Sequence, residues 1–409
     1  MRRRNFFLRL VASLLVSLLV VSVSAAQTAK FKGLHTFTGG SDGAGPSSPL
    51  AFDRAGNLYG TTSGGGSGTG CSGGCGTVFE LIPSTPKWKE RVLFSFPSVI
   101  DPIGQLVLDT KGNVYGASIV GGGPCNCGEV YQLVRTSNGW TQNILHTFVG
   151  GTSDGQYAQS GLVQDSVGNL YGATESGGFN GNNGVVYELS PNGDGTWKYS
   201  IIYEFGVVGG DAANPYGPLK IDAAGNLFGT AANGGLYGWG AAFKLTRSGT
   251  SWTETILYNY TLDFGSPPQP DGVVLDSAGN LYGTTISDGE FSLGTVYKLT
   301  PTIGYWNHTV LHTFTGASDG AYPYGGVTIG PSGVLYGTAD SGGIFGYGTV
   351  YKLVQGGNGH WTETVLHSFK KTDGANPFAG VVLDQLGNLY GIAGNGGADG
   401  LGVAFEITP

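Results

Sequence analysis

The stretch Asp384-Gln-Leu-Gly-Asn-Leu-Tyr-Gly391 occurs in close copies seven times along the 409-residue chain. The glycine that opens each Gly-Asn-Leu-Tyr-Gly core recurs at nearly even spacing, at Gly56, Gly112, Gly168, Gly225, Gly279, Gly333 and Gly387. Self-similarity at a fixed period is the sequence signature of a repeat architecture. The sequence therefore predicts one structural unit built seven times.

Each copy contains four short runs rich in Val, Ile, Thr, Tyr and Phe, which we label strands a to d. In the sixth copy these runs are residues 326–329, 334–338, 349–353 and 361–369. Such residues bounded by Gly, Asn, Asp or Pro are typical of β-strands, and no sustained helical period appears beyond the N-terminus. The Asp-x-x-Gly-Asn link between a and b predicts a tight hairpin, because its residues tolerate positive φ and bond their own backbone.

The two ends of the repeat array complement each other. Four strands in each copy are too many for one rung of a β-solenoid and suit one blade of a β-propeller. The last copy stops after strand c at residues 402–407, whereas an orphan Leu34-His-Thr-Phe37 before the first copy matches strand d. An open stack would leave two exposed sheet edges. We therefore predict an all-β, closed seven-bladed propeller of four-stranded blades, in which the N-terminal strand completes the C-terminal blade.

Composition fits a single globular domain. The chain has 76 Gly, but no Gly-x-y period, and its 40% hydrophobic content supplies a core. The formal net charge is −8, and no basic cluster follows the first ten residues. Nucleic acid is excluded as a partner, because phosphate binding needs concentrated Lys and Arg. We expect a monomer and no cofactor.

Residues 1–26 have the parts of an export signal. Arg2 to Arg4 give the positive start, residues 11–23 the apolar run, and residues 24–26 the small residues for cleavage. An uncleaved anchor is the alternative, and residues 3–8 resemble a twin-arginine signal. The sequence predicts a secreted protein, extracellular or periplasmic, whose single propeller spans residues 27–409 with no membrane span after cleavage.

The four cysteines lie in two places, Cys71 with Cys75 and Cys125 with Cys127, in the b–c links of blades 1 and 2. In an oxidising compartment disulfides are expected. They join either the two cysteines of each link or the two blades. A four-thiolate zinc site is the other alternative, but Cys-x-Cys is not the usual zinc spacing.

Several side chains recur at fixed positions of the repeat. A tryptophan opens strand d in six blades, which predicts packing between blades rather than stacking platforms: Trp88, Trp140, Trp197, Trp252, Trp306 and Trp361. A second position of strand d accepts His, Phe or Tyr, which predicts space-filling with one ring nitrogen bonded; its histidines are His35, His146, His312 and His367.

An acidic residue recurs in the link from strand d to the next strand a. It is expected either to form an Asx turn or to bring carboxylates to the channel mouth for calcium or sugar hydroxyls. These residues are Asp42, Asp154, Asp211, Asp319 and Asp373.

In an up-and-down blade the b–c and d–a links share one face of the ring. Function on a symmetric scaffold resides where the copies differ. Blades 3 to 6 carry aromatic residues in glycine-rich b–c links, either as lids on the core or as a patch for sugar rings or a peptide. The candidate ligand-binding aromatic residues are Phe179, Tyr237, Trp239, Phe291, Phe345 and Tyr347. Asp154, Asp211, Asp319 and Asp373 are expected beside them.

No catalytic residue is assigned. Serine-hydrolase, metalloprotease and phosphate-loop motifs are absent. The sequence favours a secreted binding or scaffold protein. The alternative is a carbohydrate-active hydrolase or lyase, which needs two carboxyls close together at the channel mouth. The b–c links supply Glu175, Asp288, Glu290 and Asp340 for such a pair. A structural surface protein without a ligand is the third possibility.

The run from Gly279 to Leu299 resembles the Gloeo/Verruco, or GloVer, tandem repeat through Gly-Asn-Leu-Tyr-Gly-Thr-Thr and Gly-Thr-Val-Tyr-Lys-Leu. The resemblance spans residues 34–409. It implies an exported bacterial protein of unassigned activity, often with a C-terminal surface anchor. Here the chain ends at Pro409 directly after a strand. The shorter Asp-x-x-Gly-Asn-Leu-Tyr piece is similar to NHL-type propeller repeats and implies only a hairpin.

Overall fold

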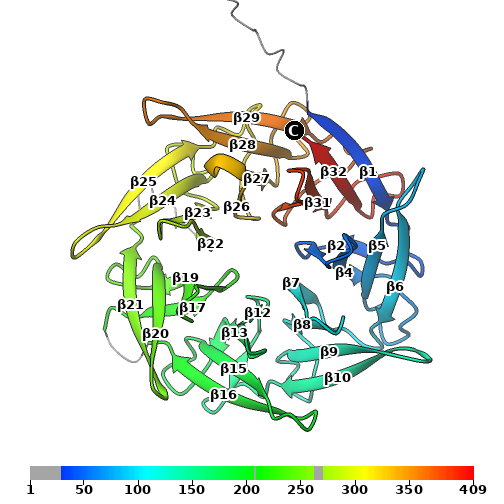
Figure 1. Ribbon diagram of the computed structural model, residues 1–409, viewed down its shortest axis with the longest axis horizontal. Helices are drawn as coiled ribbons and strands as arrows, with labels where there is room; N and C mark the ends of the chain where they lie inside the picture. The colour runs from blue at the N-terminus through cyan, green and yellow to red at the C-terminus, as the bar shows by residue number, and fades with distance from the viewer. Residues whose placement is uncertain (1–28, 207–208, 262–269) are drawn as a thin grey trace, which may run out of the picture.

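The computed structural model describes residues 29–206, 209–261 and 270–409, so the predicted export signal lies outside the described residues. Seven antiparallel blade sheets stand around a central axis, each with its strands ordered from the axis outward, and a separate two-stranded sheet, β11-β14, belongs to the third blade (Figure 1). The only helical element in these ranges is the 3-10 turn η1 (Pro331–Gly333). The predicted all-β, seven-bladed propeller is confirmed.

The blades follow one another along the chain. Blade 1 contains β2 (Ala44–Pro46), β3 (Ala51–Phe52), β4 (Leu58–Gly64), β5 (Thr77–Ile82) and β6 (Lys89–Ser95), and blade 2 contains β7 (Pro102–Leu108), β8 (Val114–Ser118), β9 (Glu129–Thr136) and β10 (Gly139–Thr147). Blade 3 contains β11 (Gly155–Gln156), β12 (Val163–Gln164), β13 (Leu170–Thr174), β14 (Ser176–Gly177), β15 (Val185–Pro191) and β16 (Trp197–Glu204). Blade 4 contains β17 (Ala212–Pro215), β18 (Lys220–Ile221), β19 (Leu227–Gly234), β20 (Ala241–Ser248) and β21 (Ser251–Asn259), and blade 5 contains β22 (Pro270–Leu275), β23 (Leu281–Thr285), β24 (Thr295–Pro301) and β25 (Trp306–Thr313). Blade 6 contains β26 (Val327–Ile329), β27 (Leu335–Ala339), β28 (Thr349–Gln355) and β29 (Trp361–Ser368), and blade 7 contains β30 (Val382–Leu383), β31 (Leu389–Ala393), β32 (Val403–Thr408) and β1 (Lys30–Thr36).

Blade 7 is closed by the N-terminal strand. Its strand order is β1-β32-β31-β30, and β1 runs antiparallel to β32 from the Lys30–Thr408 pair to the Thr36–Val403 pair. The Phe37 N–H then donates to the carbonyl of Gly402 at 3.0 Å, just as the Phe369 N–H of blade 6 donates to Gly348. The seventh blade therefore reproduces the other six with a strand taken from the opposite end of the chain.

The repeated Asp-x-x-Gly-Asn link folds as the hairpin that its residues predict. In blade 1 one carboxylate oxygen of Asp53 accepts the N–H groups of Ala55 and Asn57 at 2.8 and 2.9 Å. Its other oxygen accepts the Asn57 side-chain amide and the Tyr59 hydroxyl, at 2.8 and 3.2 Å. Gly56 between them has a φ of 87°, which favours glycine. A single aspartate thus fixes the link between the two inner strands.

The last glycine of Gly-Asn-Leu-Tyr-Gly makes room for an aromatic ring of strand c. A Cβ added to Gly337 would lie 2.4 Å from the hydroxyl oxygen of Tyr351, whose side chain is fully buried. The same approach recurs between Gly172 and Tyr187 in blade 3 and between Gly391 and Phe405 in blade 7. Glycine is required at this position because the interior is already filled.

We expect Gly337→Ala to lower the free energy of unfolding by about 1–3 kcal/mol, because the added methyl group overpacks a closed core. Urea denaturation of the two proteins measures the difference. Gly357→Ala is the matched control, since nothing lies within 4 Å of a Cβ at that exposed position. Equal midpoints for wild type and Gly337→Ala would contradict the packing argument.

The tryptophans that open strand d pack between blades. Trp88 of blade 1 contacts Tyr390 of blade 7 with ring centroids 5.8 Å apart, and Trp252 of blade 4 lies 6.1 Å from Tyr171 of blade 3. Each such tyrosine belongs to strand b of the preceding blade. The core is therefore a ring of similar clusters, one at each blade junction.

Candidate functional site

The b–c and d–a links lie together on one face of the ring, as the strand order predicts. In blade 1 the Gly66 N–H in the b–c link donates to the carbonyl of Gly40 in the d–a link at 2.8 Å. In blade 6 Gly343 donates to Ala317 at the same distance. We call this surface the loop face.

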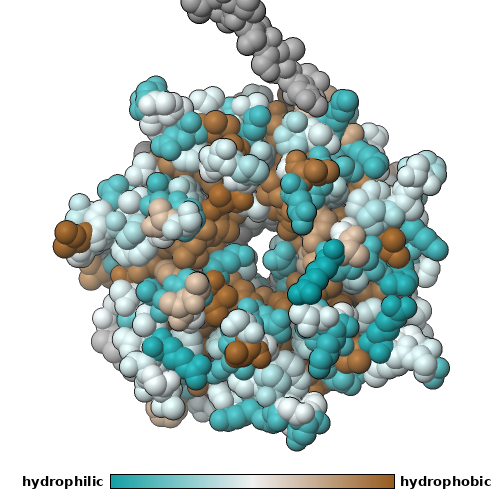
Figure 2. All heavy atoms as spheres, viewed as in Figure 1, coloured by the Kyte–Doolittle hydropathy of each residue, from teal (hydrophilic) through white to brown (hydrophobic). Residues whose placement is uncertain are grey.

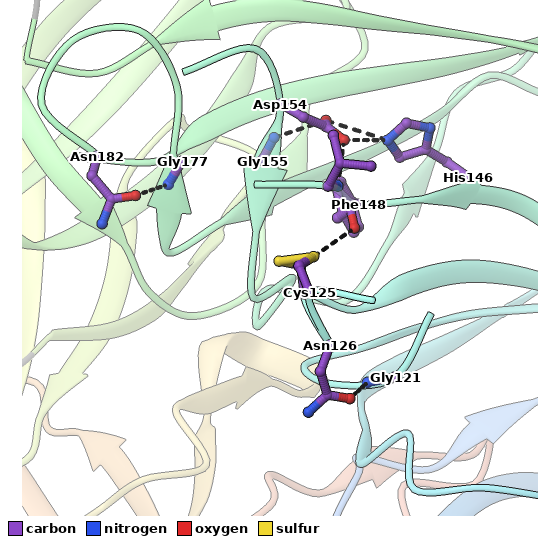
Figure 3. The surroundings of a disulfide bond; sticks show 11 residues. Gly121, Cys125, Asn126, His146, Phe148, Asp154, Gly155, Gly177 and Asn182 are labelled. Carbon is purple, nitrogen blue, oxygen red and sulfur yellow. Dashed lines mark hydrogen bonds and ion pairs between the residues drawn. A yellow bond between two sulfur atoms is a disulfide. The ribbon is translucent and has the colours of Figure 1, made fainter. Parts of the chain in front are cut away.

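On the loop face, blades 1 and 2 carry the cysteines. Cys71 is bonded to Cys75 and Cys125 to Cys127, so each disulfide closes its own link and neither joins the two blades. The Cys125 sulfur lies 3.2 Å from the Phe148 carbonyl oxygen (Figure 3). Asn126, at a φ of 56°, accepts the Gly121 N–H at 2.7 Å. The within-link pairing is the confirmed alternative.

Blades 3 to 6 carry exposed apolar side chains in the equivalent links. The exposed fraction is 73% for Phe179, 55% for Tyr237 and 49% for Phe291, which excludes a role as lids on the core. Trp239, in contrast, is half-buried. We define the loop aromatic surface as the exposed members of these links: Phe179, Leu236, Tyr237, Phe291, Ile344, Phe345 and Tyr347.

The aspartates of the d–a links point into the blade junctions. Asp154 is only 4% exposed. Its carboxylate bonds the His146 ring nitrogen at 3.0 Å and accepts the Gly155 N–H (Figure 3). It also accepts the Tyr199 hydroxyl at 2.7 Å and the Val149 N–H. The His146 and Tyr199 rings stack with centroids 3.6 Å apart. This carboxylate is therefore already occupied by protein donors.

The same arrangement recurs at other junctions. His35 lies 3.2 Å from Asp42, His312 3.3 Å from Asp319 and His367 3.2 Å from Asp373; at the junction of blades 3 and 4, the Tyr203 hydroxyl donates to Asp211 at 2.8 Å. Burial lowers the pKa of His35, His312 and His367, although the neighbouring carboxylates act in the opposite direction. The bonded ring nitrogen expected at this position of strand d is present in His35 and His146, which hydrogen-bond the aspartate of the following link. His312 and His367 approach their aspartates closely, but their ring nitrogens lack hydrogen-bond geometry.

A third residue, which was not among those predicted from the sequence, completes three of these junctions. It stands two positions after the strand d tryptophan of the next blade, as Glu90, Glu254 and Glu363. Burial, reinforced by the hydrogen bond and charge of Asp211, raises the pKa of Glu254 to about 9. Burial and the charge of the junction aspartate raise the pKa of Glu90 and of Glu363 to about 7. The recurring Trp-x-Glu spacing was the available signal.

Two of the four acids considered for catalysis, Asp288 and Glu290, lie in the same b–c link, and Glu175 and Asp340 lie in two others. Glu175 accepts a hydrogen bond from Gln159, and Glu290 is exposed. Burial raises the pKa of Asp340. The paired carboxyls are instead those of the blade junctions. Over the described ranges, no three or more His, Cys, Asp or Glu side chains gather as a metal site.

An opening runs along the axis of the ring. Figure 2 shows it together with apolar surface on the side of β23 and β27. In the part of the chain that the structure describes, no helix is long and apolar enough to cross a membrane.

Solved structures resemble this chain at low sequence identity. A putative 6-phosphogluconolactonase from Bacteroides uniformis is 14% identical with a TM-score of 0.53, over 78% of this chain and 84% of that protein. The periplasmic gluconolactonase of Pseudomonas aeruginosa is 14% identical with a TM-score of 0.50, over 80% and 85%. A fungal alcohol oxidase of the AA5 family in complex with copper is 15% identical with a TM-score of 0.54, over 93% and 76%. These similarities concern the fold, which hosts many functions.

No curated protein matches the sequence. The model of the Gloeobacter/Verrucomicrobia repeat matches residues 19–182, 68–276 and 214–409, which together span nearly the whole chain and agree with the repeat found in the sequence. The chain therefore belongs to the Gloeobacter/Verrucomicrobia repeat family.

Proposed function

We propose that the protein is a secreted, non-catalytic binding protein that holds a glycan against the loop aromatic surface. The observation that carries this proposal is the exposure of aromatic rings in four consecutive b–c links, including Phe179, Tyr237 and Phe291. Large apolar side chains gathered on one exposed face of a protein mark interaction sites. Secretion agrees with the two disulfides, which persist in oxidising compartments.

A glycan fits these links better than a protein partner. Each link carries one to three exposed apolar side chains flanked by Gly, Asn, Ser or Glu, whereas the core of a protein interface is usually continuous and apolar. No Lys or Arg occurs in any b–c link, so these links disfavour an anionic ligand. The Lys370 ammonium lies 5.6 Å from the Phe345 ring centre. Sugar rings stack on exposed aromatic faces while amides and hydroxyls bond their hydroxyl groups.

Mature protein is expected to bind members of a polysaccharide panel, and Tyr237→Ala combined with Phe345→Ala is expected to weaken binding about tenfold, since two stacking platforms are lost. Affinity electrophoresis and pull-down on insoluble polysaccharides measure the effect. Leu386→Ala is the control, because Leu386 is 88% exposed but lies in an a–b hairpin on the opposite face.

Unchanged binding by the double variant would remove the loop aromatic surface from the proposal. Capture of a protein but of no polysaccharide would replace the glycan with a protein partner. Release of reducing sugars or unsaturated products from the same panel would instead identify a hydrolase or lyase.

A further inference from the structure

We propose that the cavity between blades 4 and 5 is the primary subsite of this protein for a short, uncharged oligosaccharide. This inference rests on the proposed glycan-binding function and names its site and ligand class. The cavity has a volume of about 590 Å³, within the range of small-molecule sites. It is lined by Tyr237, Thr255, Ile256, Leu257, Tyr258, Asn259, Thr302, Gly304, Tyr305 and Trp306.

Three segments form the walls. One wall is the outer edge of β21, the last strand in the sheet order of blade 4. The opposite wall is the hairpin between β24 and β25, which projects beside the end of β21 (Figure 1). Tyr237 reaches the cavity from the b–c link of blade 4, so the cavity is continuous with the loop aromatic surface.

The lining has the chemistry of a neutral sugar site. Tyr237 and Tyr305 are 55% and 65% exposed, which leaves ring surface free for stacking. Thr255 supplies a hydroxyl group, Asn259 an amide group, and the Thr302 hydroxyl, which donates within its own hairpin, supplies an acceptor. None of the ten lining residues is charged, and phosphate or carboxylate ligands are usually held by Arg or Lys. Aromatic faces combined with uncharged polar groups therefore select uncharged, polyhydroxylated rings.

The walls are held in place by the protein's own contacts. The Leu236 N–H donates to the side-chain oxygen of Asn259 at 2.7 Å, which ties the Tyr237 link to the end of β21. In the opposite hairpin, the Thr302 hydroxyl donates to the Tyr305 carbonyl at 2.6 Å. Tyr258 stacks on His308 with ring centroids 4.5 Å apart. A ligand would thus meet a preformed site and lose less conformational entropy on binding.

The neighbouring groove between blades 5 and 6 shows what is particular to this cavity. It has the same position in the repeat but a volume of about 340 Å³, and its lining includes Lys298 and His360. His360 occupies the place that Tyr305 has before the strand d tryptophan; in the other blades with this tryptophan, the residue is Lys87, Gly139, Thr196 or Ser251. Tyr305 is therefore the distinguishing residue of the cavity.

The test titrates the mature protein with a panel of neutral tri- to pentasaccharides of different linkage, using calorimetry and tryptophan fluorescence, since Trp306 lines the cavity. Tyr305→Ala, and separately Thr255→Arg, which introduces a charged side chain at an exposed position of β21, are each expected to weaken binding at least tenfold. His360→Ala in the neighbouring groove is the matched control and is expected to bind like wild type. Circular dichroism and thermal melting establish that each variant is folded.

Loss of binding in the two cavity variants, with the control unaffected, would support the site. Normal binding by folded Tyr305→Ala and Thr255→Arg, while the Tyr237/Phe345 double variant is impaired, would overturn the cavity and leave the glycan function standing. Equal or tighter binding of acidic oligosaccharides, or of peptides, would overturn the ligand class. Absence of binding to every saccharide offered would overturn both proposals together.

Discussion

A chain that starts at Thr38 is expected to lose cooperative folding, although it retains every strand of blades 1 to 6. Removing β1 leaves the backbone edge of β32 unpaired and takes away Leu34 and Phe37, which are 6% and 0% exposed. Deleting a buried phenylalanine side chain alone costs about 3–5 kcal/mol. Domains are stabilised by only about 5–15 kcal/mol in total. Urea denaturation followed by circular dichroism, with light scattering for aggregation at the exposed edge, measures the loss.

A rearranged chain provides the control for this deletion. If residues 29–37 are joined behind Pro409 through a short glycine-rich linker, the strand returns to β32 through an ordinary hairpin, as in the other six blades. Folding of this rearranged chain would show that the strand itself, rather than its position in the sequence, closes the ring. A Thr38 start that unfolds at the same urea concentration as the mature protein would refute closure by β1.

Raising the pH from 6.5 to 9 is expected to destabilise the protein through Glu254. This carboxyl is half-buried against Asp211, which accepts a hydrogen bond from Tyr203, and its pKa is raised to about 9 from the ordinary 4.5. The folded state therefore keeps a proton that the unfolded state releases. The stabilisation that this bound proton contributes is fully present below pH 4.5 and is lost as the pH rises towards 9.

The histidines act in the opposite direction below this window. The lowered pKa of His35, His312 and His367 makes stability rise with pH until the unfolded histidines become neutral near pH 6.5. Any decline in stability above pH 6.5 is therefore attributed to the glutamates and not to the histidines. Besides Glu254, these are Glu90 and Glu363, whose pKa values are raised to about 7.

In Glu254→Gln, the glutamine is a permanently neutral analogue of the protonated glutamate. We expect its stability to fall less steeply than that of wild type between pH 7 and 9, by up to about 1.4 kcal/mol per pH unit, the value for one proton. Urea midpoints across this range measure the slopes. Glu290→Gln, in an exposed link, should follow wild type. Parallel slopes for wild type and Glu254→Gln would show that Glu254 does not carry the pH dependence.

The sequence predicted those features whose partners lie within one blade. The Asp53 hairpin is fixed by residues at most six positions apart, so its chemistry can be read directly from Asp-x-x-Gly-Asn. The closing strand was predictable because a missing run at one end of the chain matched a surplus run at the other. Packing of the tryptophans followed from their repetition.

Apart from the packing of the tryptophans, contacts between neighbouring blades could not be predicted in the same way. Glu254 meets Asp211 from the preceding d–a link only because the outer strand of each blade begins beside the blade before it. That approach depends on the twist of the blade, for which no local sequence pattern exists. The cavity between blades 4 and 5 has the same origin, since Tyr237 and Tyr305 come from different blades and face one space only after the ring is assembled.

The pairing of Lys30 with Thr408 at one end of the β1–β32 ladder has a mechanical consequence. Segments attached before Lys30 and after Thr408 leave the ring at the same point. A pulling force applied through them would load the hydrogen bonds one after another, in the manner of a zipper, instead of all together in shear. The ring would yield to such tension at this seam while the hairpins of the other six blades remained intact.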